Sequence, residues 1–406
     1  MAFQSPSFAD IQTAQSELSR FLSPTPLLRS AWLSDALHCE LYLKLETMSA
    51  IGSFKIRGAS YKISRLSEAE KKAGVIAASA GNHAQGVAWG SRRYGVDAVI
   101  VMPKSAPLTK VLNTQALGAK VILEGDSYDE AFAAAQRIQN ETGRTYIHAY
   151  LDTDVIAGQG TVGLEILSQL PETEWIISSM GGGGLLAGIA IVCKELSPSV
   201  RLIGGQAEGA ASLVRSIETG KAVKSAKAET FADGIAIAEA KEPMRALLAP
   251  LLSEVHTVND EAIASAVLTL LEKAKVVAEG AGALPLAIAE KIQAELKGKK
   301  VVLVIGGGNI DVNLLGRIID RGLIRAGRRL RVNAVISDRP GSLNRLTQII
   351  AREGGSILQV IHDRNEPGTT IDQTDVQMTL ETRGPDHSRA LIQAIKDQVI
   401  RLDEQL

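Results

Sequence analysis

Short apolar runs alternate with amphipathic segments along most of the chain. Continuous apolar runs at 74–79, 97–103 and 119–125 predict buried strands, because each run is short and turn-forming or polar residues bound it. Apolar residues at helical spacing between and after these runs predict helices over 83–94, 107–117 and 127–141. Strands and helices that alternate in this way are typical of a parallel sheet covered by helices on both faces.

A second series of the same kind begins near residue 157. Its predicted elements are helices over 158–169 and 185–196 and strands over 174–179, 201–206 and 300–305. We therefore expect two α/β lobes, with a small lobe at about 46–149 inserted in a large lobe, within a domain of residues 1–326. Two such lobes form a cleft, and ligands in these folds bind at the carboxyl ends of the strands.

The pattern changes from about residue 326, where the basic stretch "RAGRRLRV" begins a new series. Its predicted elements are a strand over 329–337, a helix over 341–354, strands over 356–364 and 369–383, and a helix over 386–399. This β-α-β-β-α order predicts a ferredoxin-like α+β domain over residues 327–406. The final strand of such a unit has no clear pattern in 400–406.

Composition narrows the classes of protein that the chain can belong to. With 406 residues, 45% hydrophobic and 22% charged, it is expected to be a soluble globular protein of two or three domains. The net charge is −1 and basic residues do not gather in one stripe, which argues against nucleic-acid or membrane binding. The two cysteines, Cys39 and Cys193, suit neither a disulfide framework nor a metal motif. The N-terminus lacks an export signal and no apolar run is long enough to span a membrane, so we expect a cytoplasmic protein.

A lysine occupies an unusual position in the stretch "IGSFKIRGAS" at residues 51–60. Lys55 lies between Phe54 and Ile56, while Gly52 and Gly58 favour turns. An ammonium group among apolar neighbours loses solvation, which lowers its pKa and favours the nucleophilic neutral amine. The alternative is an amphipathic loop whose lysine extends into water.

Three glycine-rich turns follow predicted strands, at 79–86, 180–188 and 305–311. In the first, "SAGNHAQG", backbone N–H groups at the start of a helix are suited to a carboxylate. In the second, four successive glycines leave no side chain between the backbone and a ligand, so N–H groups can hold a phosphate directly. The second turn is neither a dinucleotide motif nor a Walker motif. Glycines are also common in tight turns without any functional role.

The chain resembles a known family at several of these motifs. "GSFKIRGA", "SAGNHAQGVA", "AGQGT", "GGGGLLAG", "AEGAGA" and "GGGNID" occur in the order and spacing of threonine dehydratases (threonine ammonia-lyases). These are pyridoxal-phosphate enzymes of the tryptophan synthase β-like fold (fold type II), and the resemblance covers about residues 8–325. It implies that Lys55 forms the Schiff base with the cofactor and later removes the α-proton of the substrate.

The resemblance also implies roles for other positions, each taken from the matching motif. They are Phe54 beside the cofactor ring, Asn82 at its 3′-oxygen, Ser79, Gly81 and His83 at the substrate carboxylate, Gly181, Gly182, Gly183, Gly184 and Leu185 at the 5′-phosphate, and Gly306 at the pyridine nitrogen. For His83 the alternative is that it only caps its helix. Where many relatives have serine or cysteine, Gly306 offers the pyridine nitrogen no side chain.

The implied reaction is deamination of L-threonine to 2-oxobutanoate and ammonia, with L-serine to pyruvate as a second reaction, by elimination of the β-hydroxyl. A serine or threonine racemase of the same fold is the runner-up, although Ala80 replaces the serine that serves as second base in racemases. A non-catalytic amino-acid sensor is a third alternative. A cation site of some relatives uses a glutamate that aligns with Gln206, so we expect no metal there, and Glu208 is either a ligand or a solvated acid.

The turn "SDRPGSL" at 337–343 resembles the signature of ACT domains, which bind amino acids. This resemblance implies an allosteric effector near Asp338, Gly341 and Ser356, with isoleucine as first candidate and valine as second. A domain that only drives oligomerisation is the alternative. The resemblance also implies a homotetramer, and isoleucine biosynthesis is the first of two metabolic roles, the other being catabolic.

Overall fold

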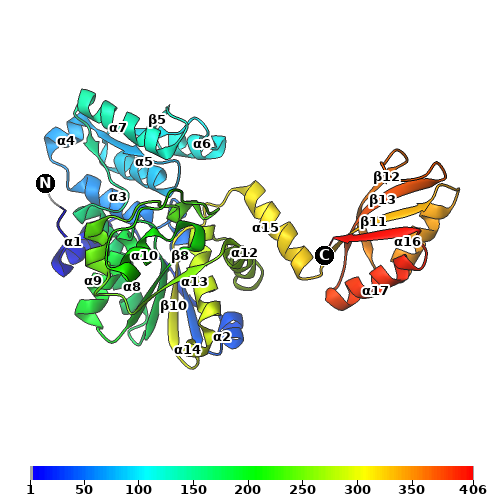
Figure 1. Ribbon diagram of the computed structural model, residues 1–406. Helices are drawn as coiled ribbons and strands as arrows, with labels where there is room; N and C mark the ends of the chain where they lie inside the picture. Colours follow the sequence, from blue (N-terminus) through cyan, green and yellow to red (C-terminus); the bar gives the residue numbers. More distant parts are fainter. Residues whose placement is uncertain (1–2, 406) are drawn as a thin grey trace. The chain divides into compact units, whose positions relative to one another are not determined.

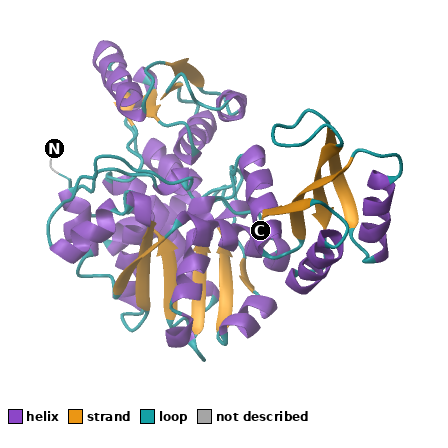
Figure 2. Cartoon of the chain, turned by 45° about the vertical axis from the view of Figure 1, so that its right-hand side comes forward, coloured by secondary structure: helices purple, strands orange, loops and turns teal. Residues whose placement is uncertain are grey.

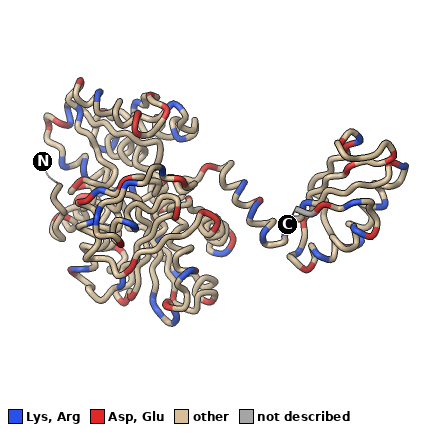
Figure 3. Tube along the Cα trace, in the orientation of Figure 1, with Lys and Arg blue, Asp and Glu red and all other residues tan. Residues whose placement is uncertain are grey.

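A computed structural model of the protein describes residues 3–405 (Figure 1). The chain divides into two compact units, Met1–Ile310 and Asp311–Leu406. This division falls earlier than the boundary expected at 326, because helix α15 (Val312–Arg325) contacts strand β11 (Arg329–Ser337) of the second unit. Within residues 3–405, no helix has both the length and the apolar character needed to cross a membrane. Figure 3 shows positive and negative residues interspersed over the trace of the first unit.

The large lobe of the first unit is built on a six-stranded sheet of order β1-β2-β10-β7-β8-β9. Its strands are β1 (Leu27–Arg29), β2 (Glu40–Leu45), β7 (Trp175–Ser179), β8 (Arg201–Ala207), β9 (Glu254–Val258) and β10 (Lys300–Ile305). Only the pairing of β1 with β2 is antiparallel among these strands, so the carboxyl ends of the other five meet at one edge.

Helices cover both faces of this sheet (Figure 2). They are α1 (Phe8–Leu18), α2 (Ala31–Leu37), α8 (Thr153–Gln169), α9 (Gly184–Leu196), α10 (Ser212–Thr219), α11 (Glu242–Leu248), α12 (Asp260–Thr269), α13 (Gly280–Lys291) and α14 (Gln293–Leu296), with the short turns η1 (Glu46–Met48), η2 (Glu208–Ala210), η3 (Asp233–Ile235) and η4 (Leu270–Ala274). Strands β7 and β10 are buried on both sides, as their continuous apolar sequences predict. The sheet residues Val302 and Val304 belong to the same core as Ile189 of α9, and α13 packs on β7 to β10.

The small lobe has a parallel sheet of order β5-β4-β3-β6. Its elements are α3 (Lys55–Ser64), α4 (Glu68–Ala73), β3 (Val75–Ala78), α5 (Asn82–Tyr94), β4 (Ala98–Met102), α6 (Leu108–Ala116), β5 (Lys120–Leu123), α7 (Tyr128–Thr142) and β6 (Thr145–Tyr146). The three strands and three helices predicted between 74 and 141 are thereby confirmed, with ends that differ by a few residues.

Helix α3 joins the two lobes, because it packs on α5 and also on α8 of the large lobe. The expectation of a turn at Gly58 is wrong, since this residue lies inside α3. A Cβ at Gly58 would overlap the carbonyl of Val155 and the amide of Gln159, and a Cβ at Gly158 would overlap Gly58 itself. Glycine is therefore required at Gly58 and Gly158 for the close approach of α3 and α8, not for a turn.

Four buried charged side chains fix the first turn of α3. Arg57 donates through Nε to Glu46 at 2.8 Å and through Nη1 to Glu165 at 2.5 Å, and Lys44 donates to Glu165 at 2.6 Å. Each of the four is at most 6% exposed at its side chain, and the two positive and two negative charges balance. Although burial opposes charge on Glu165, Arg57 and Lys44 hold the pKa of this carboxyl below its usual value.

The second unit has the ferredoxin-like arrangement that its sequence predicts. Its elements after α15 and β11 are α16 (Ser342–Arg352), β12 (Ser356–Asp363), β13 (Gln373–Glu381), α17 (Pro385–Lys396) and β14 (Arg401–Gln405). The sheet has the order β12-β13-β11-β14, and residues of α16 and α17 share a core with alternate residues of β11 and β13. Strand β14, which the sequence did not reveal, pairs with β11, and its Leu402 packs on the core.

Candidate functional site

The three glycine-rich turns follow strands of the two sheets, as the sequence predicts. Residues 79–81 lead from β3 into α5, residues 180–183 lead from β7 into α9, and residues 306–311 follow β10. Strands β7 and β10 are neighbours in the large sheet, so their turns lie side by side. Lys55, at the start of α3, is close to this edge because Phe54 N–H donates to the Gly306 carbonyl at 3.0 Å.

Lys55 is the first residue of α3. Its Nζ donates to the carbonyl of Ala149 at 2.8 Å and lies 5.2 Å from the centre of the Phe54 ring. Burial lowers the pKa of the Lys55 amine to about 8, and the nearby Glu279 carboxylate opposes part of this effect. The structure therefore favours the desolvated lysine over the solvent-exposed lysine that the sequence left open.

The four glycines form the amino end of α9. Gly183 has a φ of 91° and precedes the helix as its N-cap residue, where it has no side chain with which to cap the first N–H groups. A Cβ at Gly182 would overlap the ring of Tyr150, and one at Gly181 would lie 2.9 Å from the carbonyl of Gly234. The turn thus presents backbone N–H groups at the positive end of a helix, which suits an anion such as a phosphate.

The turn after β3 contains Ser79, Gly81 and His83. Ser79 Oγ accepts a hydrogen bond from Gly81 N–H at 3.2 Å. The His83 side chain is buried, its Nε2 lies 2.8 Å from the Ile147 carbonyl, and burial lowers its pKa to about 3. The neutral ring donates to that carbonyl and ties α5 to the end of β6, which leaves the backbone of this turn for a ligand. The predicted substrate role of His83 stays a prediction.

Phe54 explains the glycine at position 306. A Cβ on Gly306 would lie 3.3 Å from the Phe54 ring and 3.9 Å from Leu185, which is tight for any side chain. A serine or cysteine here would therefore require the Phe54 ring to shift by a few tenths of an ångström.

Two polar residues that the sequence analysis did not single out converge on Asn82, the first residue of α5. Asn82 Nδ2 donates to Glu279 Oε1 at 2.7 Å, and Asn309 Nδ2 donates to Asn82 Oδ1 at 2.7 Å. Burial raises the pKa of Glu279 to about 7. Both residues lie inside quoted motifs, "AEGAGA" and "GGGNID", so their position in these motifs was the signal that could have identified them.

The segment 148–151 also borders the glycine turn, and no pattern in the sequence indicated it. His148 Nδ1 accepts hydrogen bonds from the N–H groups of Tyr150 and Leu151 at 3.2 and 2.9 Å. Burial and the charge of Lys55 lower the pKa of His148 to about 4, so this imidazole is neutral. The rings of His148 and Tyr150 meet edge to face with centres 4.7 Å apart, which places Tyr150 against Gly182.

Residues near the end of β8 have a structural role. Gln206 is buried, and its Oε1 accepts from the N–H groups of Leu213 and Val214 at 2.8 Å each, which caps the start of α10. Among the residues that the structure describes, no group of three or more His, Cys, Asp or Glu side chains is placed to hold a metal ion. Ala80 packs against the core of the small lobe and carries no titratable group.

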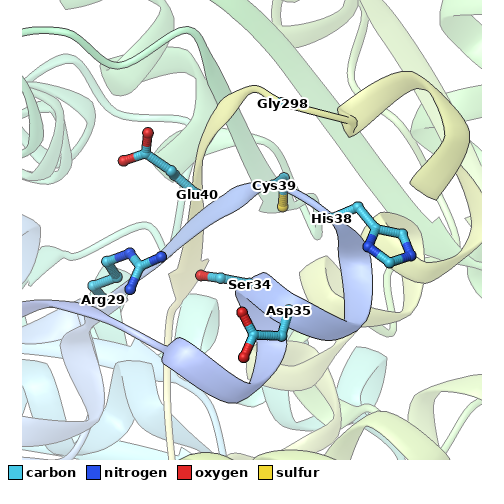
Figure 4. Close-up of a pocket in the computed structure, with 7 residues that line it drawn as sticks. All are labelled: Arg29, Ser34, Asp35, His38, Cys39, Glu40 and Gly298. Atoms are coloured by element: carbon cyan, nitrogen blue, oxygen red, sulfur yellow. The ribbon is translucent and has the colours of Figure 1, made fainter.

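A surface pocket of about 380 Å³ lies at the opposite edge of the large sheet. It is lined by Arg29, Ser34, Asp35, His38, Cys39, Glu40 and Gly298 (Figure 4). Glu40 and Gly298 adjoin the amino ends of β2 and β10, whereas ligands of α/β folds bind at the carboxyl ends. We therefore separate this pocket from the candidate site.

In the second unit, the structure brings two of the three predicted effector residues together. Asp338 and Gly341 share the turn between β11 and α16, where Asp338 pairs with Arg364 at 2.9 Å and Gly341 has a φ of 89°. Ser356 begins β12 and pairs with Glu381, which is also opposite Arg329 at the start of β11. Ser356 therefore lies at the other end of the sheet within one chain.

The features of the first unit fit one class of protein. A desolvated lysine amine, an amide of fixed orientation and a glycine turn at a helix amino end are the groups that can bind, respectively, an aldehyde, a ring oxygen and a phosphate. A Cβ at Gly182 would overlap the Tyr150 ring, so the backbone of this turn carries no side chain there. The chain belongs to the pyridoxal-phosphate dependent enzyme family, whose model matches residues 18–307. This membership confirms the expected two-lobed α/β fold and the cofactor.

Individual relatives support the same class. The chain is 46% identical over 378 residues to an L-threonine ammonia-lyase of Thermotoga maritima, and the aligned region covers 93% of this chain and 94% of that protein. It is similar to the solved structure of the processed form of threonine deaminase isoform 2 from Solanum lycopersicum, with 33% identity, a TM-score of 0.74 and coverage of 79% of this chain and 91% of that chain. It is also similar to the solved structure of maize serine racemase, with 32% identity and a TM-score of 0.74, covering 79% of this chain and 99% of that chain.

Proposed function

We propose that this protein is an L-threonine ammonia-lyase that uses pyridoxal phosphate to convert L-threonine into 2-oxobutanoate and ammonia, and L-serine into pyruvate. The observation that carries the proposal is the desolvated amine of Lys55 beside the glycine turn of α9. The identity with the Thermotoga maritima L-threonine ammonia-lyase supports the substrate. When bound, pyridoxal phosphate withdraws electron density from the α-carbon of an amino acid, which makes its α-proton removable by a weak base.

Lys55 is the residue that binds the aldehyde of the cofactor and then removes the α-proton. Its pKa of about 8 leaves a larger share of the amine neutral at neutral pH than an ordinary lysine has. As the first residue of α3 it is held by the packing of that helix on both lobes, which would keep the amine at the site when it is not bonded to the cofactor. The α-proton and the β-hydroxyl of the substrate would be lost together as water, and hydrolysis of the released enamine would then give the 2-oxo acid and ammonia.

The other predicted residues bind and orient. We assign the phosphate to the N–H groups of Gly181 to Leu185, and the substrate carboxylate to the turn of Ser79, Gly81 and His83. Asn82 would offer an amide N–H to the 3′-oxygen, and the Phe54 ring, which lies close to Gly306, would flank the cofactor ring. Gly306 would offer the pyridine nitrogen no side chain, which suits elimination because an unprotonated ring stabilises a long-lived carbanion poorly.

The direct test is release of 2-oxo acid from L-threonine by the purified protein loaded with pyridoxal phosphate. We expect 2-oxobutanoate and ammonia in equal amounts. A protein that binds the cofactor but releases no 2-oxo acid from threonine or serine would contradict the proposal.

A serine or threonine racemase is the second candidate, because maize serine racemase is among the similar structures. Ala80, where racemases have the serine that acts as second base, cannot move a proton and disfavours it. Chiral analysis of the remaining amino acid distinguishes the two reactions, since only a racemase accumulates the D-enantiomer. A non-catalytic sensor would bind amino acids without releasing either product.

The glycine turn gives a first prediction. We expect Gly182→Ala to weaken pyridoxal-phosphate binding about tenfold or more, because overpacking against the Tyr150 ring costs about 1–3 kcal/mol. Titration of the visible absorption of the cofactor measures the dissociation constant. Gly316→Ala, where a Cβ meets nothing within 4 Å, is the matched control and is expected to leave binding unchanged. Equal binding by both variants would contradict the predicted phosphate site.

We further propose that residues 327–406 form an ACT domain that binds an amino-acid effector, isoleucine first and valine second. The ferredoxin-like sheet order and the turn of Asp338 and Gly341 support this assignment. The alignment with the Thermotoga maritima relative spans 378 of 406 residues and must include much of the second unit, which begins at Asp311. We expect L-isoleucine to suppress 2-oxobutanoate release and Asp338→Asn to weaken this effect. Activity that is indifferent to both amino acids would leave the domain an oligomerising module.

We also propose that the chain forms a homotetramer, and the edge of the second sheet supports self-association. Strand β12 is an edge strand whose Leu358 and Ile361 are 49% and 46% exposed. We expect Ile361→Lys to lower the mass in solution to about half, as loss of one interface class of a tetramer does. Light scattering after size exclusion measures the mass. Ile371→Lys changes another exposed isoleucine and serves as control, and unchanged mass in Ile361→Lys would exclude β12 from the interface.

A further inference from the structure

A chain of hydrogen bonds runs through the site from a backbone carbonyl to a carboxyl group. Asn309 Nδ2 donates to the Ile51 carbonyl at 2.8 Å and to Asn82 Oδ1 at 2.7 Å. Asn82 Nδ2 in turn donates to Glu279 Oε1 at 2.7 Å. Residues from the loop before α3, from the turn after β10, from α5 and from the start of α13 are thus linked in one series of hydrogen bonds.

The donors and acceptors in this series of hydrogen bonds can be assigned in only one way. The Ile51 carbonyl can only accept, so Asn309 must present its NH₂ group to it. The second hydrogen of that NH₂ group is then donated to Asn82, which must present its oxygen to Asn309 and its NH₂ group to Glu279. One hydrogen of Asn82 Nδ2 is used by Glu279, and the other remains for a ligand.

The position of Glu279 is fixed as strongly as that of Asn82. Glu279 precedes α13 as its N-cap residue, and its N–H donates to the Gly307 carbonyl at 3.1 Å. A Cβ at Gly307 would overlap Glu279 Oε1, so glycine at this position makes room for the carboxyl group. The carboxyl group is therefore held against Asn82 by the backbone on both sides.

We propose that Glu279 and Asn309 are positioning residues that lock the Asn82 amide with its free N–H directed at the ring oxygen of bound pyridoxal phosphate, and that the protonation state of Glu279 modulates that cofactor. The inference rests on the proposed function, because it takes the assignment of Asn82 to the cofactor from it. It adds the two residues that orient Asn82 and a titrating group that acts through it.

Opposing influences place the pKa of Glu279 close to neutral pH. Burial raises the pKa of Glu279 to about 7, while the Asn82 hydrogen bond and the charges of Lys110 and Lys55 favour the carboxylate and Asp233 disfavours it. Lys110 and Asp233 pair with each other at 2.7 Å, so they partly offset each other. Below about pH 7 the carboxyl group is mostly protonated, and above it the carboxylate draws more strongly on one hydrogen of the Asn82 NH₂ group, which makes the other N–H a weaker donor to the ring oxygen.

The test uses the absorption of the bound cofactor in the full chain, which requires no turnover. We expect the visible band of the wild-type protein to shift with pH around an apparent pKa near 7. Glu279→Gln retains an acceptor for Asn82 but cannot titrate, so we expect cofactor affinity within about threefold of wild type and loss of this shift. Glu279→Ala removes the acceptor, and we expect affinity to fall about tenfold.

Glu290→Gln is the matched control, since Glu290 is a partly buried glutamate of the same α13 whose pKa burial also raises. We expect it to keep both the affinity and the pH-dependent shift. A Glu279→Gln protein whose band still shifts around the same pKa would overturn the inference, as would unchanged affinity in Glu279→Ala. Wild-type protein that shows the shift but releases no 2-oxo acid would instead overturn the proposed function and leave this inference standing.

Discussion

Lys55→Ala is expected to lower the release of 2-oxobutanoate from L-threonine by about a thousandfold or more, because the variant lacks the base that we propose for the α-proton. The fold should survive, since alanine favours helix formation and Lys55 Nζ loses a single hydrogen bond, to the Ala149 carbonyl, among residues 3–405. Steady-state assays measure the turnover number. Reduction with borohydride, followed by mass spectrometry of peptides, should attach the cofactor to the wild-type chain and not to the variant.

Lys71→Ala is the control for this experiment, because Lys71 lies on α4 and pairs with the exposed Glu68. It should retain wild-type turnover. Added primary amines should restore part of the activity of Lys55→Ala, as expected when a missing amine is replaced from solution. A Lys55→Ala protein with undiminished turnover would refute both the lyase and the racemase proposals.

Arg57→Met is expected to have the largest effect on stability. It leaves the carboxylates of Glu46 and Glu165 without their shared partner in the interior, and breaking a buried pair costs about 3–5 kcal/mol. Urea denaturation followed by tryptophan fluorescence measures this loss. All three tryptophans, at positions 32, 89 and 175, lie in the first unit, so the signal reports on that unit.

The pH dependence of this difference has a definite sign. In the wild type the pKa of Glu165 lies below 4.5, so the pair stabilises the fold above that pH and loses its effect as the pH falls. In Arg57→Met the Glu165 carboxyl group has lost its main positive partner, so its pKa rises. As the pH falls, this carboxyl group is therefore protonated at a higher pH in the variant than in the wild type, which removes the unpaired buried charge. The difference in unfolding free energy should therefore narrow as the pH is lowered from about 7.5 to about 5.

Arg137→Met provides the comparison, because Arg137 pairs with Glu124 and Glu141 on the surface. Exposed pairs are screened by water, so the urea midpoint should barely change. Equal midpoints for the two variants would show that the buried charges contribute no more than surface pairs.

Local sequence patterns account for the framework of the site. Apolar runs of strand length identified β3, β7 and β10, and the glycines after them predicted where backbone N–H groups would be free. Lys55 stood out because it follows one apolar residue and precedes another. These features are determined by residues within a few positions of one another, which is the range over which periodicity and turn chemistry act.

The tertiary structure decided how those parts work together. The hydrogen bond from Asn82 to Glu279 joins residues 197 positions apart, and Arg57 meets Glu165 across 108 positions. The pKa values of Lys55 and Glu279 depend on the burial that such contacts create, which is not a property of any short stretch. Gly58 looked like a turn residue and proved to be the contact between α3 and α8. The sequence by itself determined the strands, the glycine turns and the candidate lysine. Only the folded chain determined which groups bury Lys55, hold its amine and set its pKa, because those groups are distant from it in sequence.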